Sequence, residues 1–115
     1  SDRAARTEQS LQNYHFFGAP HVAIIHSEAA LGTYGAMDTG GFITAFTLAA
    51  TALGLGSIAQ ASVAAYAPMI RAHFDLPESR LILCAISFGW PDTNHPANAF
   101  RTSRAALDDI YDPRG

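Results

Sequence analysis

The segment from Thr39 to Ile70 contains no charged side chain, and this feature constrains the fold of the 115-residue chain more than any other. Together with the residues just before it, the segment predicts a helix from Met37 to Leu53 in which small or apolar residues occupy every face. A helix without a polar face is buried on all sides, and a chain this short can hardly surround one of its own helices. We therefore expect further cover, from a second copy of the chain or from a part of the fold that this sequence does not contain.

A membrane-spanning helix is the competing interpretation of the stretch from Met37 to Leu53. Its length lies at the lower limit for crossing a bilayer, and it contains several Thr residues and the Gly40–Gly41 pair. No Lys or Arg flanks it closely, so the interfacial anchors of a membrane helix are missing. We favour a buried helix and expect no membrane span.

The composition favours a surface that a partner covers in part. Charged residues make up 15% of the chain, against about 25% in typical soluble domains. The net charge of −3 argues against nucleic-acid binding. Cys84 is the single cysteine and lies in an apolar run, so it cannot form an internal disulfide, and we expect the reducing cytoplasm as its location.

The remaining sequence predicts one domain in which three strands are separated by helices, and this order is typical of an α/β-type layer fold. The predicted strands are His21–Ser27, Ser57–Gln60 and Arg80–Gly89, and the predicted helices are 1–12 (the end of a helix), Met37–Leu53 and Ser62–Phe74. Residues 28–36 read as a loop and 93–115 as a polar tail.

Two patterns carry residue types that suit ligand binding. In Gly54-Leu-Gly-Ser-Ile-Ala-Gln-Ala-Ser62, small residues leave backbone N–H groups accessible to a flat heteroaromatic ligand. The alternative is plain packing, with Gly54 as a helix C-cap, and the pattern alone favours it. In Phe100-Arg-Thr-Ser-Arg104, two Arg and two hydroxyls form a compact set of phosphate donors, each charge-assisted bond contributing roughly 1.5–3 kcal/mol. The alternative there is a solvated tail, which an isolated pattern of this kind favours.

Other reaction classes find little support. The five His residues show no metal-ligand spacing and only one Cys is present, so we expect no metal site. A Gly-x-Ser-x-Gly nucleophile elbow is absent. Composition alone leaves Ser-His-Asp chemistry open, and from the residues we assign no catalytic acid, base or nucleophile.

Taken in order, the motifs of this chain resemble the C-terminal part of the nitroreductase family of FMN-dependent oxidoreductases. The motifs are Phe16-Phe-Gly-Ala-Pro20, Gly35-Ala-Met-Asp-Thr-Gly40, Leu53-Gly-Leu-Gly-Ser57, Leu83-Cys-Ala-Ile-Ser-Phe-Gly89 and His95-Pro-Ala-Asn-Ala-Phe-Arg-Thr-Ser-Arg104. The resemblance implies an α/β (α+β) three-layer sandwich, with a mixed sheet around a long buried central helix. It also implies a homodimer, with 1–115 as the C-terminal portion of a single, incomplete domain and 93–115 as an extended tail that wraps the partner.

The resemblance further implies FMN as the cofactor, bound at the dimer interface. Gln60, Ala61 and Ser62 would face the isoalloxazine ring, and Arg101 and Arg104 would reach the phosphate. The implied reaction is NAD(P)H-dependent reduction of a small aromatic acceptor, nitroaromatic or quinone-like, by a ping-pong hydride mechanism.

Two departures from the family keep other functions open. Family members are about twice as long, and the N-terminal half that normally carries an Arg-Ser-x-Arg phosphate-binding stretch is missing. Many relatives also have an acidic residue and a Gly where this chain has Gln60-Ala61-Ser62. The alternatives are a truncated, non-catalytic module that dimerises or binds flavin, and a specialised relative such as a dehalogenase or flavin-consuming enzyme.

Overall fold

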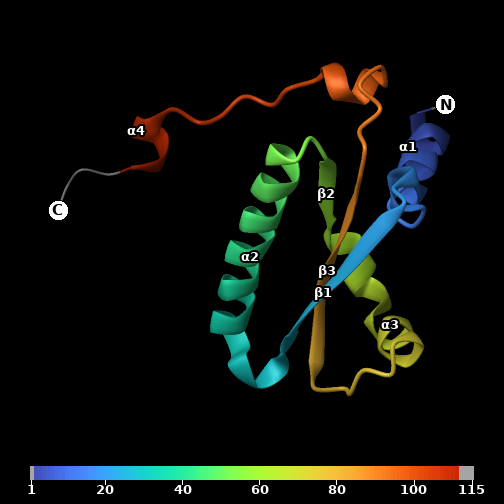
Figure 1. Ribbon diagram of the computed structural model, residues 1–115, viewed down its shortest axis with the longest axis vertical. Coiled ribbons are helices and arrows are strands. Elements are labelled where there is room, and N and C mark those ends of the chain that lie inside the picture. The colour runs from blue at the N-terminus through green and yellow to red at the C-terminus, as the bar shows by residue number, and fades with distance from the viewer. Residues whose placement is uncertain (1, 112–115) are drawn as a thin grey trace.

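The fold is a three-stranded sheet with helices on both faces (Figure 1). The computed structural model describes residues 2–111; residue 1 and residues 112–115, which belong to the predicted first helix and tail, lie outside the described residues. The elements are α1 (Asp2–Leu11), β1 (His21–Glu28), α2 (Gly32–Ala52), β2 (Gly56–Gln60), the 3₁₀ segment η3 (Ala61–Tyr66), α3 (Ala67–His73), β3 (Arg80–Gly89) and α4 (Leu107–Ile110), with short 3₁₀ turns at Phe16–Gly18, Ala29–Leu31 and Pro96–Ala99.

All three predicted strands are present, within one residue at each end. β3 lies in the middle and pairs antiparallel with β1 on one side and β2 on the other. Helices cover the middle of β3 on both faces, which explains its apolar sequence. Ala85 and Ile86 are fully buried, whereas Leu81 near the start of the strand is exposed. The predicted layered α/β class is confirmed, although both strand pairs are antiparallel, so a mixed sheet would need a strand beyond these three.

The main core lies on the sheet face opposite α2. Its buried side chains come from η3, α3 and β3, and Phe16 from the turn after α1 packs against them. The pairing register of β1 and β3 shifts between Ile25 and His26, because β3 has one extra residue there, Leu83. The core residues are Val63, Ile70, Ile82 and Ala85, bordered by Phe16, Val22, Ile24, Ala67 and Leu76.

The long helix α2 begins earlier than its sequence suggested. The predicted loop at 28–36 was wrong, since the helix already starts at Gly32. The reason is packing: a Cβ on Gly35 would lie 2.6 Å from Ser27 Oγ and 2.7 Å from Leu31 Cβ. The missing side chain of Gly35 lets the first turn of α2 approach the end of β1. Gly35 therefore does not mark an irregular segment.

The far end of α2 is closed by a glycine cap. Gly54 has φ +77°, the Leu55 N–H donates to the Ala50 carbonyl at 2.9 Å and the Gly54 N–H donates to the Thr51 carbonyl at 3.0 Å. This is the Schellman arrangement, which satisfies carbonyls that the helix itself leaves unpaired. The C-cap role expected for Gly54 is confirmed.

Much of α2 remains uncovered within this chain. One side packs on the sheet, where the rings of Phe46 and Phe88 meet edge to face at 5.3 Å. Only Gly35 and Ala50 are buried along the whole helix. Leu48 is 67% exposed on the side away from the sheet, which also carries Tyr34 and Met37. Burial of α2 on all sides therefore needs atoms that residues 2–111 do not supply.

The predicted helix over Ser62–Phe74 is divided in two. Residues 61–66 form η3, and a separate α3 starts at Ala67 with Pro68 in its first turn. Pro68 has no N–H to bond the preceding turn, so a continuous α-helix cannot run through it. Its fixed φ instead suits the start of a new helix.

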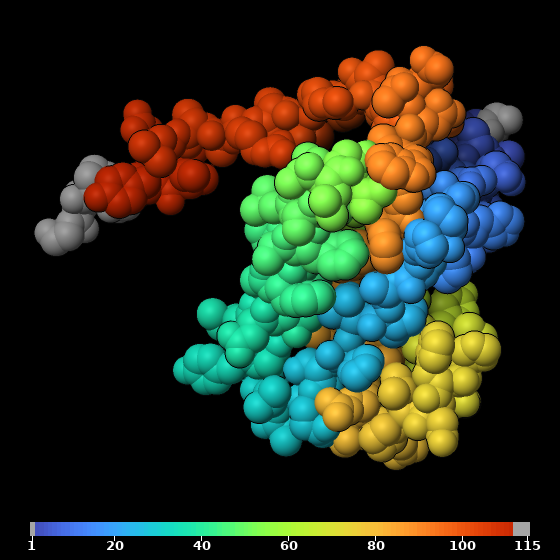
Figure 2. Space-filling view, in the orientation of Figure 1, coloured from blue at the N-terminus to red at the C-terminus, as the bar shows by residue number. Residues whose placement is uncertain are grey.

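The tail leaves the body of the molecule after β3 (Figures 1 and 2). Between Trp90 and Tyr111 it forms only a 3₁₀ turn and the short α4, and most of it is extended. Its large apolar side chains are exposed, Phe100 by 71% and Ile110 by 73%. No helix in the described part of the chain is long and apolar enough to cross a membrane.

We predict that Gly54→Ala lowers the free energy of unfolding by roughly 1–2 kcal/mol, because an L-residue with a Cβ is strained at positive φ. Gly54→Asn is the matched control and loses less, since Asn tolerates the left-handed region better. Urea denaturation with linear extrapolation measures both. An Ala variant as stable as the parent would contradict the assigned cap.

Candidate functional site

The Gln60–Ser62 turn lies where β2 ends and η3 begins. The Gln60 side chain points into the core and is only 2% exposed. Its Nε2 donates to the Asn13 carbonyl at 2.7 Å, and its Oε1 accepts a hydrogen bond from Ser87 Oγ. With its amide engaged at both ends, Gln60 has no side-chain group directed at a ligand.

The following two residues offer backbone donors instead. The first N–H groups of a 3₁₀ segment have no partner within that segment, and the Gln60 side chain does not cap η3. Ala61 is exposed and small, so its side chain leaves the main chain open to approach. Ser62 Oγ is buried and, among the described residues, finds no hydrogen-bond partner. Free main-chain N–H groups beside a small side chain fit the edge of a flat ring that accepts hydrogen bonds, such as a flavin.

Arg101 and Arg104 lie on the extended tail, exposed to solvent. Arg101 Nη1 donates to the carbonyls of Asn98 and Phe100, the latter at 2.8 Å. Arg104 Nη1 donates to the Thr102 hydroxyl and to backbone carbonyls beside it. Each guanidinium therefore contacts only its own segment, and both remain available to an anion.

The structure does not bring the two predicted groups together within one chain. The tail begins at the Gly56–Gly89 end of the sheet, whereas Gln60 pairs with Ala85 four residues farther along, roughly 13 Å away at strand spacing. From Gly89 the tail continues away from the sheet (Figure 1). Within residues 2–111, the tail that carries Arg101 therefore does not lie beside the Gln60–Ser62 turn.

A groove of about 570 Å³ lies on the sheet face opposite α2, and the sequence analysis missed it. The rings of Tyr14 and Tyr66 meet edge to face across it at 5.2 Å. Desolvation, together with the neighbouring Tyr66, raises the pKa of Tyr14, so its phenol stays neutral. The aromatic residues after α1 were its only sequence signal. The lining residues are Tyr14, Phe16, Val22, Ile24, Val63, Tyr66, Met69, Ile70, His73 and Phe74.

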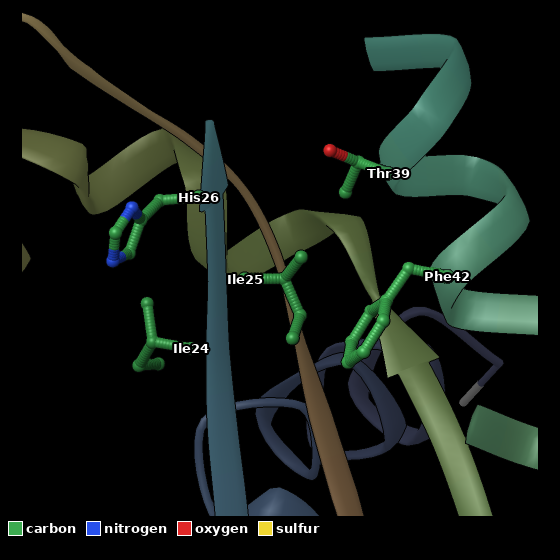
Figure 3. A pocket seen from close by; sticks show the side chains of 5 residues that line it. All are labelled: Ile24, Ile25, His26, Thr39 and Phe42. Carbon is green, nitrogen blue, oxygen red and sulfur yellow. The ribbon is translucent and has the colours of Figure 1, made fainter. Parts of the chain in front are cut away.

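A smaller hollow of about 210 Å³ lies at the edge of β1 and is lined by Ile24, Ile25, His26, Thr39 and Phe42. Figure 3 shows Ile25, Thr39 and Phe42 between β1 and α2, while Ile24 and His26 point to the other side of the strand. Thr39 Oγ1 donates to the Gly35 carbonyl at 2.7 Å. His26 Nδ1, on the other side of β1, is buried and has no hydrogen-bond partner among the described residues. One imidazole among apolar groups is not a set of reacting residues.

Side-chain nucleophiles and metal ligands do not gather elsewhere in the described residues. Burial raises the pKa of the Cys84 thiol, so the thiol stays protonated and is a poor nucleophile. Within residues 2–111, no three His, Cys, Asp or Glu side chains lie close enough to hold a metal ion. The site with the best ligand-binding chemistry is therefore the turn at Gln60–Ser62.

Comparison with characterised proteins adds relatives of about twice this length. The chain is 37% identical over 98 residues to the 4-nitrobenzoate reductase of Nocardioides sp. (strain LMS-CY), covering 84% of this chain and 39% of the relative. It is 34% identical over 103 residues to the 4-nitrobenzoate reductase of Pseudomonas putida, covering 90% of this chain and 45% of the relative. The chain thus spans less than half the length of these relatives.

Solved structures share the fold over nearly the whole chain. The FMN and NADPH-dependent nitroreductase NfnB from Sphigopyxis sp. strain HMH superposes with a TM-score of 0.95 at 30% identity, over 100% of this chain and 52% of that one. The FMN-dependent nitroreductase NfnB from Mycobacterium smegmatis, solved with NADPH, gives a TM-score of 0.83 at 34% identity, over 90% of this chain and 46% of that one. Since residues 1–90 also match the nitroreductase family profile, this chain belongs to the nitroreductase family.

Proposed function

We propose that this chain is part of an FMN-dependent NAD(P)H oxidoreductase that reduces nitroaromatic compounds. The superposition on an FMN and NADPH-dependent nitroreductase over the full length of the chain carries this proposal. Because the chain spans about half of that structure, we assign the activity to the complete enzyme. In it, residues 1–115 form the C-terminal portion of a single domain. The lone, buried Cys84 suits a reducing cytoplasm.

A homodimer is part of this proposal, and α2 supports it. The outer side of α2 is apolar, and a Cβ added to Gly40 or Gly41 would meet nothing within 4 Å. Small residues on such a side let a second helix approach closely. In a two-fold dimer the same surface serves both copies, so α2 would pack on its symmetry mate.

The tail supports the same arrangement. Its apolar side chains, Phe100 and Ile110 among them, have no cover on their own chain. We propose that the tail, predicted over 93–115, wraps the partner and buries these groups there. It would then carry Arg101 and Arg104 toward the partner's Gln60–Ser62 turn, which one chain alone cannot do.

The residues of this chain would hold FMN in two ways. Main-chain N–H groups at Ala61 and Ser62 would bond the isoalloxazine ring, while Arg101 and Arg104 would neutralise the phosphate. When bound, FMN supplies the hydride-transfer chemistry, taking electrons from NAD(P)H and passing them to the acceptor. The chain's task would then be binding and orientation.

We extend the proposal to reaction order and acceptor range. If one face of the ring receives donor and acceptor in turn, the kinetics are ping-pong, and flat quinones can take the place of nitroaromatic compounds. The competing function is a non-catalytic module that dimerises or binds flavin. It is favoured by one observation, that the chain covers only 39–52% of the relatives and structures compared.

The deciding experiment is the visible absorbance of the purified complete enzyme, with released flavin identified by mass. We expect bound FMN and NADPH oxidation that depends on 4-nitrobenzoate, with parallel double-reciprocal plots for a ping-pong order. Bound FMN without turnover would favour the flavin-binding module. A colourless protein that takes up no added FMN would refute the oxidoreductase assignment for this chain.

We predict that Arg101→Ala/Arg104→Ala weakens FMN binding by about 100-fold or more, since two charge-assisted phosphate bonds are lost at roughly 1.5–3 kcal/mol each. Riboflavin, which has no phosphate, would bind the variant as well as it binds the parent. Flavin fluorescence titration measures both ligands. Arg3→Ala/Arg6→Ala on the exposed α1 is the matched control and leaves both affinities unchanged. Unaltered FMN affinity in the tail variant would remove these residues from the site.

We predict that Leu48→Asp converts the dimer to monomers, because it places a charge in the middle of the proposed α2 contact. Light scattering of the parent would give twice the mass of one chain. Leu11→Asp, an equivalent change on the exposed side of α1, is the control and keeps the dimer. A monomeric parent, or a Leu48→Asp variant that remains dimeric, would exclude α2 as the interface.

A further inference from the structure

Gln60 and Ser87 are the buried polar residues of the described chain, with exposures of 2% and 1%, and they are bonded to each other. They lie on different strands, Gln60 at the end of β2 and Ser87 two residues before the end of β3. A third segment joins them, because Gln60 Nε2 donates to the carbonyl of Asn13 in the turn after α1. One amide thus links three parts of the chain.

The two side chains occupy neighbouring positions on the same face of the sheet. Gln60 is opposite Ala85, and Ser87 is opposite Ile58, two residues before Gln60. Residues opposite each other in a ladder point to the same face, so Gln60 and Ser87 are diagonal neighbours. That face also bears Ala85 of the core, where water is excluded.

The chemistry of this position requires an amide. The Asn13 carbonyl needs a donor, and the Ser87 hydroxyl, which donates to Oε1, needs an acceptor. A carboxylate would present acceptors to both, and an apolar side chain would leave both groups buried without a partner. A Gln satisfies the two demands at once.

The amide is placed where the chain turns from β2 into the proposed flavin-contacting segment. Ala61 has an exposed methyl group, and Ser62 Oγ has no hydrogen-bond partner in the described residues, so neither side chain ties the turn by a hydrogen bond. The Gln60 side chain is therefore the polar group whose hydrogen bonds fix the chain next to these main-chain donors. Any movement of Gln60 carries Ala61 and Ser62 with it.

We propose that Gln60, held by Ser87 Oγ and the Asn13 carbonyl, is a positioning residue that sets the main chain of Ala61 and Ser62 against the flavin ring. This inference rests on the proposed function and assigns to Gln60 a role different from direct contact. Because the ring changes its hydrogen-bonding pattern on reduction, a displaced turn changes the relative affinity for the oxidised and reduced forms.

The test compares Ser87→Ala and Gln60→Glu with Ser87→Thr, which keeps the hydroxyl, in the flavin-loaded protein. We expect Ser87→Ala and Gln60→Glu to change the ratio of the two flavin affinities about tenfold. This corresponds to about 30 mV in the midpoint potential of a two-electron couple. Ser87→Thr would keep the potential of the parent. Hydrogen exchange at residues 60–66 would be faster in the first two variants.

Ile82→Val separates positioning from stability. It shortens a core side chain on the same face and lowers the melting temperature without touching the amide, so it leaves the potential unchanged. A Ser87→Ala variant with the parent's potential and exchange rates would overturn the positioning role while leaving the proposed function intact. A parent protein that binds no FMN would overturn both. A shift of equal size in Ile82→Val would show that Gln60 acts through general stability alone.

Discussion

The packing of α2 on one face of the sheet is the contact on which the rest of the structure depends. Phe46 and Phe88 meet there, and the helix leads through the Gly54 cap directly into β2. The sheet covers only one side of a helix whose other sides are also apolar. The opposite side leaves apolar surface exposed, which is unfavourable in water, and this surface is the one that supports the proposed dimer.

At the end of β2, the Gln60 side chain has a structural role, whereas the main chain of the next two residues is available to a ligand. The Gln60 side chain points inward, and its amide forms hydrogen bonds with Ser87 and Asn13. The main chain of the next two residues keeps free donors. A site built from backbone N–H groups gains rigidity from the strand that precedes it, and tolerates changes in the exposed side chain at Ala61. In the proposed function, such a segment would bind the flavin without any of the residue types that normally mark an active site.

Sequence reasoning located the regular elements well and their junctions poorly. Strands at 21–27, 57–60 and 80–89 follow from apolar runs bounded by turn residues, and the structure has them with small extensions. The start of α2 was missed because Gly32 and Gly35 resemble a loop, whereas Gly35 serves a close contact with Ser27. The division at Pro68 was missed because the apolar pattern continues across it. Hydrophobic periodicity shows neither cause. At Gly35 the cause is a tertiary contact, and at Pro68 it is the missing backbone N–H.

The flavin-contacting role of the Gln60–Ser62 turn and of Arg101 and Arg104 stays a prediction. The structure adds that the Gln60 side chain is buried, and nothing in a strand pattern tells which face of the sheet the last residue joins. The apolar groove lined by residues from Tyr14 to Phe74 is formed by segments far apart in the chain, so no local motif predicts it.

By itself, the sequence determined the three strands, the apolar character of α2 and the need for further cover, because these depend on composition and local periodicity. Only the tertiary structure decided that the Gln60 side chain is bonded inside the core, that Gly35 is a contact point and that the tail starts at the end of the β2–β3 pair away from Gln60. These three depend on which distant segments meet, and that is set by strand pairing and packing rather than by residue type.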